Sequence, residues 1–65
     1  MINPTKIDLG RLYSIQELAG IFNVHYRTAL RWVQLGEIDA VQIGRTYRIL
    51  GERIQHRLEQ KYQLY

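Results

Sequence analysis

The chain has 65 residues, with nine lysines and arginines against six acidic residues and a formal net charge of +3. A chain of this length forms one domain at most, and it buries only about 60% of the surface that its unfolded form exposes. It contains no cysteine, which excludes disulfides and thiolate metal sites. The two histidines, His25 and His56, are too far apart for a helical metal motif. Stability must therefore come from a compact apolar core, for which the hydrophobic content of 46% is sufficient.

The excess of basic residues indicates a polyanionic partner, although an ordinary solubilising charge would explain it as well. No apolar run approaches the roughly 20 residues of a membrane span. The first ten residues, MINPTKIDLG, lack the apolar segment of a signal peptide. We therefore expect a cytoplasmic protein without a membrane partner.

Residues 1–11 contain a proline and a glycine and show no helical periodicity, so we expect a loose N-terminal arm. Ile7 and Leu9 alternate with polar neighbours and could add a short extended segment to the core. Residues 12–62 are expected to form the domain, and residues 63–65 a short C-terminal tail.

The first predicted helix begins after Ser14, because Ser14 and Glu17 have the spacing of a capping box. Tyr13 and Leu18 have the spacing of a hydrophobic staple around that cap. Four residues follow the helical period and give the helix one apolar face: Ile15, Leu18, Ala19 and Phe22. We expect this short helix to end near residue 22, with Asn23 in a left-handed conformation.

A short turn over residues 24–26 leads into a second predicted helix over residues 26–35, and this pairing is the signature of a helix-turn-helix. At the start of the helix, His25 is expected to act as a poor cap or to contact a phosphate, rather than to bind metal or catalyse. Gly36 is expected to end the helix.

The second helix has two distinct faces. Three residues, Ala29, Trp32 and Val33, should pack against the first helix. Four others lie in a row at spacings of three and four: Arg27, Leu30, Arg31 and Gln34. This mixture of arginine, amide and apolar groups suits base edges and thymine methyls in the major groove, and Thr28 could bond a phosphate. A solvated polar face is the alternative.

Two β-prone runs, residues 40–43 and 46–49, are separated by Gly44 and Arg45, which predicts a hairpin with a type II′ or I′ turn. Alternation favours a core face with Val41, Ile43, Tyr47 and Ile49 and an opposite face with Gln42, Thr46 and Arg48. At the tip, Gly44 allows close approach of a ligand, and Arg45 can enter a narrow minor groove. Polar residues at a hairpin tip are also expected without any ligand.

The last predicted helix covers residues 51–62. Ile54, Leu58 and Tyr62 are spaced by four and should pack on the core. A second row at the same spacing contains Arg53, Arg57 and Lys61. This row is expected to be a solvated face, or else to contact a phosphate, a neighbouring copy or another protein.

Four segments together resemble the winged helix-turn-helix domain of phage and mobile-element excisionases, within the wider MerR-like group. These segments are LYSIQELA at 12–19, RTALRWV at 27–33, GEI at 36–38 and VQIGRTYRI at 41–49. The resemblance implies an α+β fold: a small MerR-like winged helix-turn-helix with two short helices, a β-hairpin wing and a C-terminal helix. Three positions depart from the family pattern, namely His25, Leu30 and Asp39. The first two lie within the presumed DNA surface, so the target DNA sequence is not inherited.

The resemblance also implies a mode of action. The second helix would enter the major groove of double-stranded DNA and the wing the adjacent minor groove. Such proteins often bind repeats side by side, associate with one another and bend the DNA, and in excisionases this directs a tyrosine-type integrase to excision. The residues predicted to bind DNA are Tyr26, Arg27, Thr28, Leu30, Arg31 and Gln34 on the helix and Gly44, Arg45, Thr46 and Arg48 on the hairpin.

The leading functional hypothesis is therefore a sequence-specific, architectural DNA-binding protein, most concretely an excisionase. A small phage or plasmid transcriptional regulator is the second hypothesis, and sequence hardly separates the two. The third is a protein-interaction module that uses the Leu30 face or the C-terminal tail. We expect no enzymatic activity and no cofactor, because we find no paired carboxylates near a histidine, no cysteine nucleophile and no phosphate-binding glycine loop.

Overall fold

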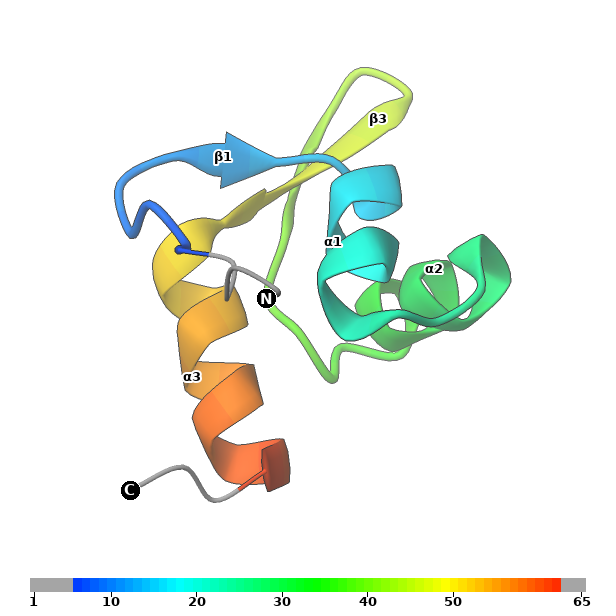
Figure 1. Ribbon diagram of the computed structural model, residues 1–65. Coiled ribbons are helices and arrows are strands. Elements are labelled where there is room, and N and C mark those ends of the chain that lie inside the picture. The colour runs from blue at the N-terminus through cyan, green and yellow to red at the C-terminus, as the bar shows by residue number, and fades with distance from the viewer. Residues whose placement is uncertain (1–5, 63–65) are drawn as a thin grey trace.

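The structure, a computed structural model, describes residues 6–62, and the side chains of residues 61 and 62 are outside that description. Six elements follow one another along the chain: β1 (Leu12–Tyr13), α1 (Ile15–Phe22), α2 (Tyr26–Gln34), β2 (Val41–Ile43), β3 (Thr46–Leu50) and α3 (Gly51–Tyr62). Figure 1 shows α3 on one side of the molecule and the α1–α2 pair on the other, joined by the sheet. The predicted α+β winged helix-turn-helix fold is confirmed.

Helix α1 begins and ends as its sequence predicts. The Ser14 hydroxyl accepts a hydrogen bond from the Glu17 backbone N–H at 3.1 Å, and the Glu17 carboxylate accepts one from the Ser14 N–H at 2.9 Å. Asn23 follows the helix with φ 55° and ψ 47°, which is the predicted left-handed conformation. The four apolar residues of the predicted face are all buried: Ile15, Leu18, Ala19 and Phe22.

The three strands form one antiparallel sheet in the order β1–β3–β2. The two-residue strand β1 was not predicted. It exists because Leu12 and Tyr13 lie opposite Leu50 and Ile49 of β3. The pairing joins segments that are far apart in the sequence, so no local sequence pattern predicts it. The hairpin β2–β3 was predicted, and its second strand extends one residue further than expected.

The predicted partition of the hairpin faces is wrong. Val41 lies opposite Arg48, and Ile43 lies opposite Thr46. Residues directly opposite each other in an antiparallel pair project to the same face, so Val41 and Ile43 share a face with Arg48 and not with the buried Ile49. Both side chains are accordingly exposed, at 57% and 55%. The two-residue turn sets this register, and the apolar character of β2 does not override it.

The backbone φ angles at the hairpin turn decide between the two predicted turn types. Gly44 has a φ of 62°, whereas Arg45 does not have a positive φ. Type I′ requires positive φ at both central residues, and type II′ only at the first. The φ angles therefore match a type II′ turn, which explains why glycine stands at the first central position.

The described part of the N-terminal arm is attached to the domain. Ile7 belongs to the core, whereas Leu9 is 52% exposed. The backbone N–H of Gly51 donates to the Arg11 carbonyl at 2.8 Å, and that of Glu52 donates to the Leu9 carbonyl at 3.2 Å. Residues 6–11 are thus packed against the start of α3 rather than loose. Residues 1–5 and the predicted tail, 63–65, lie outside the described residues.

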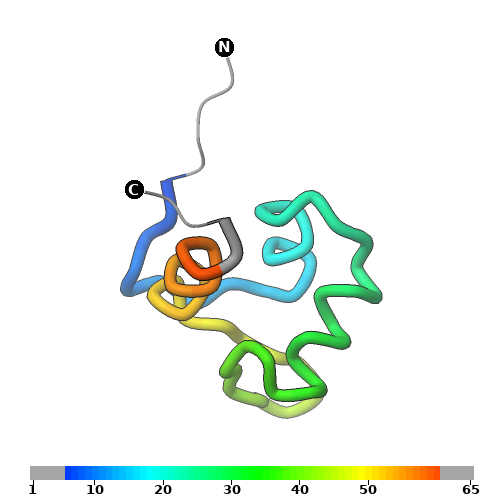
Figure 2. The backbone as a smooth tube through the Cα atoms, turned by 90° about the horizontal axis from the view of Figure 1, so that it is seen from below, coloured from blue at the N-terminus to red at the C-terminus, as the bar shows by residue number. Residues whose placement is uncertain are grey.

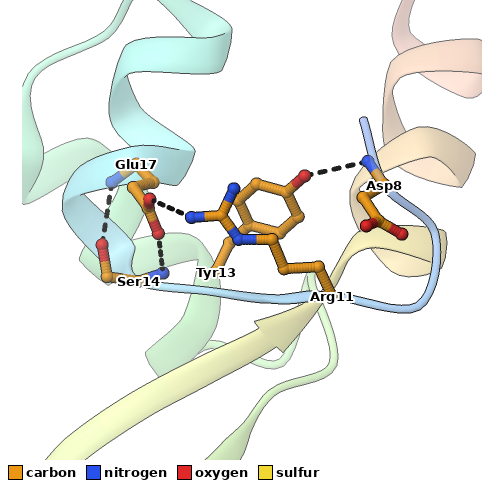
Figure 3. A network of polar contacts seen from close by, with 5 residues as sticks. All are labelled: Asp8, Arg11, Tyr13, Ser14 and Glu17. Atoms are coloured by element: carbon orange, nitrogen blue, oxygen red, sulfur yellow. Dashed lines mark hydrogen bonds and ion pairs between the residues drawn. The ribbon is translucent and has the colours of Figure 1, made fainter. Parts of the chain in front are cut away.

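Side chains tie this segment to the start of α1 as well, as Figure 3 shows. The Asp8 N–H donates to the Tyr13 hydroxyl at 2.9 Å. Arg11 pairs with Glu17 at 3.0 Å, and its guanidinium lies 4.8 Å from the centre of the Tyr13 ring. The hydrogen bond from the Ser14 backbone, followed by the Arg11 charge, lowers the pKa of Glu17 below its ordinary value of 4.5.

The core lies where α1, α2, β3 and α3 meet. Its largest fully buried side chains are Leu18, Ile49 and Ile54. Leu58 packs against the core as predicted, while Tyr62, which was predicted to do so, is among the undescribed side chains. In Figure 2 the helices surround this centre, and the hairpin projects to one side.

Candidate nucleic-acid interface

Helix α2 is capped at both ends by its own sequence. His25 Nδ1 accepts a hydrogen bond from the Arg27 backbone N–H at 3.1 Å, so this histidine acts as the N-cap that the sequence left open. At the other end, the Gly36 backbone N–H donates to the Val33 carbonyl and the Glu37 backbone N–H donates to the Trp32 carbonyl. Gly36 has a φ of 78°, and the pair of bonds is a Schellman motif. Gly36 therefore ends the helix, as predicted.

The two predicted faces of α2 are confirmed by burial. Ala29 and Val33 are buried, and Trp32 is half-buried, with its ring packed edge-on against Phe22 at 5.1 Å between ring centres. On the outer face Arg27, Arg31 and Gln34 are exposed, while Thr28 and Leu30 are half-buried. Helix α1 thus holds α2 by its inner face and leaves the polar members of the predicted row, Arg27, Arg31 and Gln34, in solvent. Leu30, which was predicted to lie in the same row, instead packs in part against the core.

A shallow groove joins α2 to the hairpin. Six of the residues predicted to bind DNA line it: Tyr26, Leu30, Gln34, Arg45, Thr46 and Arg48. Its volume is about 430 Å³. The fold therefore brings together residues that are up to 22 positions apart in the sequence, from the start of α2 to the second strand of the wing.

A second hollow adjoins this groove along α2. Arg27, Thr28 and Arg31 line it, together with Leu30 and Gln34, which also line the first groove. All six predicted residues of α2 therefore face one continuous surface. Of the predicted hairpin residues, Gly44 alone lines neither hollow. It is exposed at the tip, where its positive φ shapes the turn.

Two hairpin residues are already engaged within the wing. The Thr46 hydroxyl donates to the Ile43 carbonyl at 2.9 Å, which closes the turn. Arg48 Nη1 donates to the Tyr47 carbonyl at 3.1 Å. The Thr46 hydroxyl keeps its lone pairs for a ligand, and Arg48 keeps its remaining N–H groups. Arg45, at the tip, is exposed.

Charge is concentrated on this surface. Helix α2 and the segment 41–50 contain four arginines, at 27, 31, 45 and 48, and no acidic residue. Within residues 6–62 none of these four forms an ion pair with another described residue, whereas Arg11, Arg53 and Arg57 all do. Among the described arginines, those without an ion pair are therefore gathered on α2 and the wing.

Sequence reasoning missed the contribution of α1. Ser14, Ile15 and Gln16 line the same groove as the wing residues. The capping box located the start of α1 correctly, but no sequence signal placed that start opposite the hairpin. Its position there follows from the pairing of β1 with β3, which was not predicted either.

In the basic row on α3, Arg53 is exposed as expected of a solvated face, whereas Arg57 is not. Arg57 pairs with Glu37 at 3.0 Å, and Arg53 lies 3.8 Å from Asp39. The Lys61 side chain is outside the described part of the chain. Across the described residues, no group of three or more histidine, aspartate or glutamate side chains is arranged to hold a metal ion.

Two helices joined by a tight turn, with a hairpin beside the second helix, define a winged helix-turn-helix. The helix-turn-helix domain family matches residues 12–62. The chain therefore belongs to this family of helix-turn-helix domains, a class that binds DNA. No helix in the described residues has the length and apolar character needed to cross a membrane.

Two relatives come from two strains of Mycobacterium tuberculosis, and each carries the name putative DNA-binding protein. Each is 33% identical to this chain over 52 residues, which is 80% of this chain and 67% of the relative. No solved structure matches the chain significantly.

Proposed function

We propose that the protein binds double-stranded DNA with α2 in the major groove and the β2–β3 wing in the adjacent minor groove. The observation that carries this proposal is the gathering of the four unpaired arginines on α2 and the wing. Phosphate neutralisation supplies much of the affinity for DNA, and paired arginines would contribute less to it. The names of the two mycobacterial relatives agree with a DNA target.

The groove between α2 and the wing supports the same arrangement. If the helix and the wing occupy neighbouring grooves of one duplex, the sugar-phosphate strand that separates those grooves lies between them. The residues there are suited to this strand: Arg48 offers charge, and Tyr26 and Leu30 offer apolar surface. Arg27 and Arg31 then face base edges, for which arginine pairs well with guanine.

The more specific proposal is an excisionase: an architectural protein that binds repeated sites, associates along the DNA, bends it and directs a tyrosine-type integrase to excision. The resemblance of four sequence segments to excisionases supports this role. A single small domain makes few base contacts, so several copies on one site would supply specificity. A protein with this role acts in the cytoplasm and performs no enzymatic step of its own. A small transcriptional regulator with the same surface is the second candidate.

The test is a gel-shift titration on the DNA that flanks the reading frame and any neighbouring attachment site, with random DNA as the control. Stepwise shifts at lower protein concentration than on random DNA are expected. If the two wing arginines, Arg45 and Arg48, contact phosphates while Arg27 and Arg31 face bases, the slope of log K against log salt is about −1.8. Equal and unstepped shifts on both fragments would refute sequence-specific binding.

A recombination assay separates the two roles. Purified integrase and a supercoiled substrate with both attachment sites should give more excision when the protein is added. Specific DNA binding without any stimulation of excision would favour the regulator. A reporter fused to the bound promoter would then show the change in transcription.

A further inference from the structure

The segment between α2 and β2 contacts the rest of the domain at three consecutive positions, of which the exposed Asp39 pair contributes least. Glu37 pairs with Arg57 of α3 at 3.0 Å, Ile38 is buried in the core, and Asp39 lies 3.8 Å from Arg53. We call residues 36–40 the connector. It joins the two parts of the proposed DNA surface, so its geometry sets the distance and angle between α2 and the wing.

Arg57 contacts both the connector and α2. Its Nη2 pairs with the Glu37 carboxylate, and its Nη1 donates to the Glu37 carbonyl at 3.5 Å. Its guanidinium lies 5.2 Å from the centre of the Trp32 ring, on the inner side of α2. We call this set of three residues, Arg57, Glu37 and Trp32, the Arg57 bridge.

Within the bridge, the Arg57 side chain is largely buried, whereas Glu37 is exposed. Only 19% of the Arg57 side chain is exposed, and its Nε is buried without a hydrogen-bond partner in the described residues. A solvated arginine would satisfy that N–H with water, so burial costs free energy here. The contacts with Trp32 and Glu37 therefore fix the place of Arg57, which differs from the solvated row that the sequence suggested.

Helix α3 is also continuous with the wing. Strand β3 ends at Leu50, and α3 begins at the next residue, Gly51. Figure 1 shows the connector passing between α2 and α3 before it rises into β2. The chain thus forms a closed ring, from α2 through the connector, the wing and α3 and back to α2 through the Arg57 bridge.

We propose that Arg57 is a positioning residue for DNA binding, which holds α2 and the wing at the angle at which both contact one duplex. The proposal rests on the proposed function, since it presupposes that both elements bind DNA. Arg57 itself does not contact DNA. Its guanidinium forms an ion pair with Glu37 and faces the inner side of α2, away from Arg27 and Arg31.

The first test is Glu37→Gln, because positioning and plain electrostatics predict opposite signs. The substitution removes a negative charge, so electrostatics alone predicts tighter binding to a polyanion. Loss of the bridge predicts weaker binding to the preferred DNA fragment, by about two- to tenfold. The matched control is Glu52→Gln, which removes the same charge from an α3 residue that has no ion pair with another described residue. It should bind as tightly as the wild type or tighter.

The second test is a double-mutant cycle between Arg57→Met and Arg45→Ala. Methionine keeps an unbranched stem over Trp32 but removes the charge. If the bridge lets α2 and the wing bind one duplex together, the Arg57→Met variant has already lost part of the wing's contribution to affinity. Arg45→Ala should then cost less affinity in the Arg57→Met background than in the wild type. Circular dichroism establishes that each variant is folded at the assay temperature. If Arg57→Met does not fold, the same cycle is measured with Glu37→Gln.

Each outcome decides between the proposals. A wild-type protein with no preference for its own DNA refutes the sequence-specific binding on which the proposed excisionase and regulator roles depend. If the wild type prefers its own DNA and Glu37→Gln binds that DNA as tightly or more tightly, the positioning role of Arg57 is refuted and the proposed function is not. Additive losses in the cycle would also refute positioning, since a direct phosphate contact or a purely stabilising role gives additivity.

Discussion

Gly51 stands at the junction of β3 and α3, and its replacement tests how residues 6–11 are held. A Cβ atom at this position would lie 2.0 Å from the Asp8 carbonyl oxygen and 2.9 Å from its carbon. These are backbone atoms, so no side-chain rotation relieves the overlap. Gly51→Ala must therefore displace the arm from α3.

The structure gives the size of the effect. Displacing residues 6–11 exposes Ile7, whose burial contributes about 1.5–3 kcal/mol. It also breaks the backbone bonds from Gly51 to Arg11 and from Glu52 to Leu9, at about 0.5–1.5 kcal/mol each. Against this, alanine gains up to about 1 kcal/mol of helix propensity. We expect a net destabilisation of about 2–4 kcal/mol, and a domain this small has little more to lose.

The assay is urea unfolding followed by circular dichroism, with Gly20→Ala as the matched control. Gly20 is exposed in α1, and a Cβ there meets nothing within 4 Å. This control should therefore be stabilised by up to about 1 kcal/mol. If Gly51→Ala unfolds at the same urea concentration as the wild type or the control, the arm is not held against α3 as described.

Three further predictions concern the DNA surface, the core and pH. Arg31→Ala should lose about 1–3 kcal/mol of binding free energy and relax base preference. Arg45→Ala should instead weaken binding to all DNA sequences evenly and reduce the salt slope by about 1. Equal losses on specific and random DNA for both variants would contradict this division. Trp32→Ala should lower the free energy of unfolding by about 2–4 kcal/mol, because it removes the contact with Phe22 as well as buried surface. A variant that is as stable as the wild type but unable to bind DNA would mean that the faces of α2 are misassigned. Because the pKa of Glu17 is lowered in the folded state, its charge stabilises the fold above pH 4.5 and loses that effect as pH falls through the folded pKa. The stability advantage of the wild type over Glu17→Gln should therefore be constant near neutral pH and shrink below about pH 4.5, and a difference that does not change with pH would contradict the Arg11 and Ser14 contacts.

The sequence alone determined the local elements of this protein. The capping box at Ser14, the left-handed Asn23, the stop at Gly36 and the tight turn at Gly44 were all predicted and are all present. Each depends on hydrogen bonds or backbone angles within about four residues, so the neighbouring residues suffice to specify it. The inner face of α2 and the exposed positions of Arg27, Arg31 and Gln34 followed in the same way from helical spacing.

Tertiary structure decided which elements meet. The pairing of β1 with β3 placed the start of α1, with Gln16, beside the wing. The hairpin register put Val41 on the exposed face against its apolar character. Arg57 became a bridge to α2 because α3 packs beside the connector. The hairpin register follows from the two-residue turn, but its effect on burial appears only in the packed sheet. The contacts of β1 and of Arg57 join residues 20 to 38 positions apart, and their partners are chosen by the packing of whole elements around one core, which no local pattern of residues encodes.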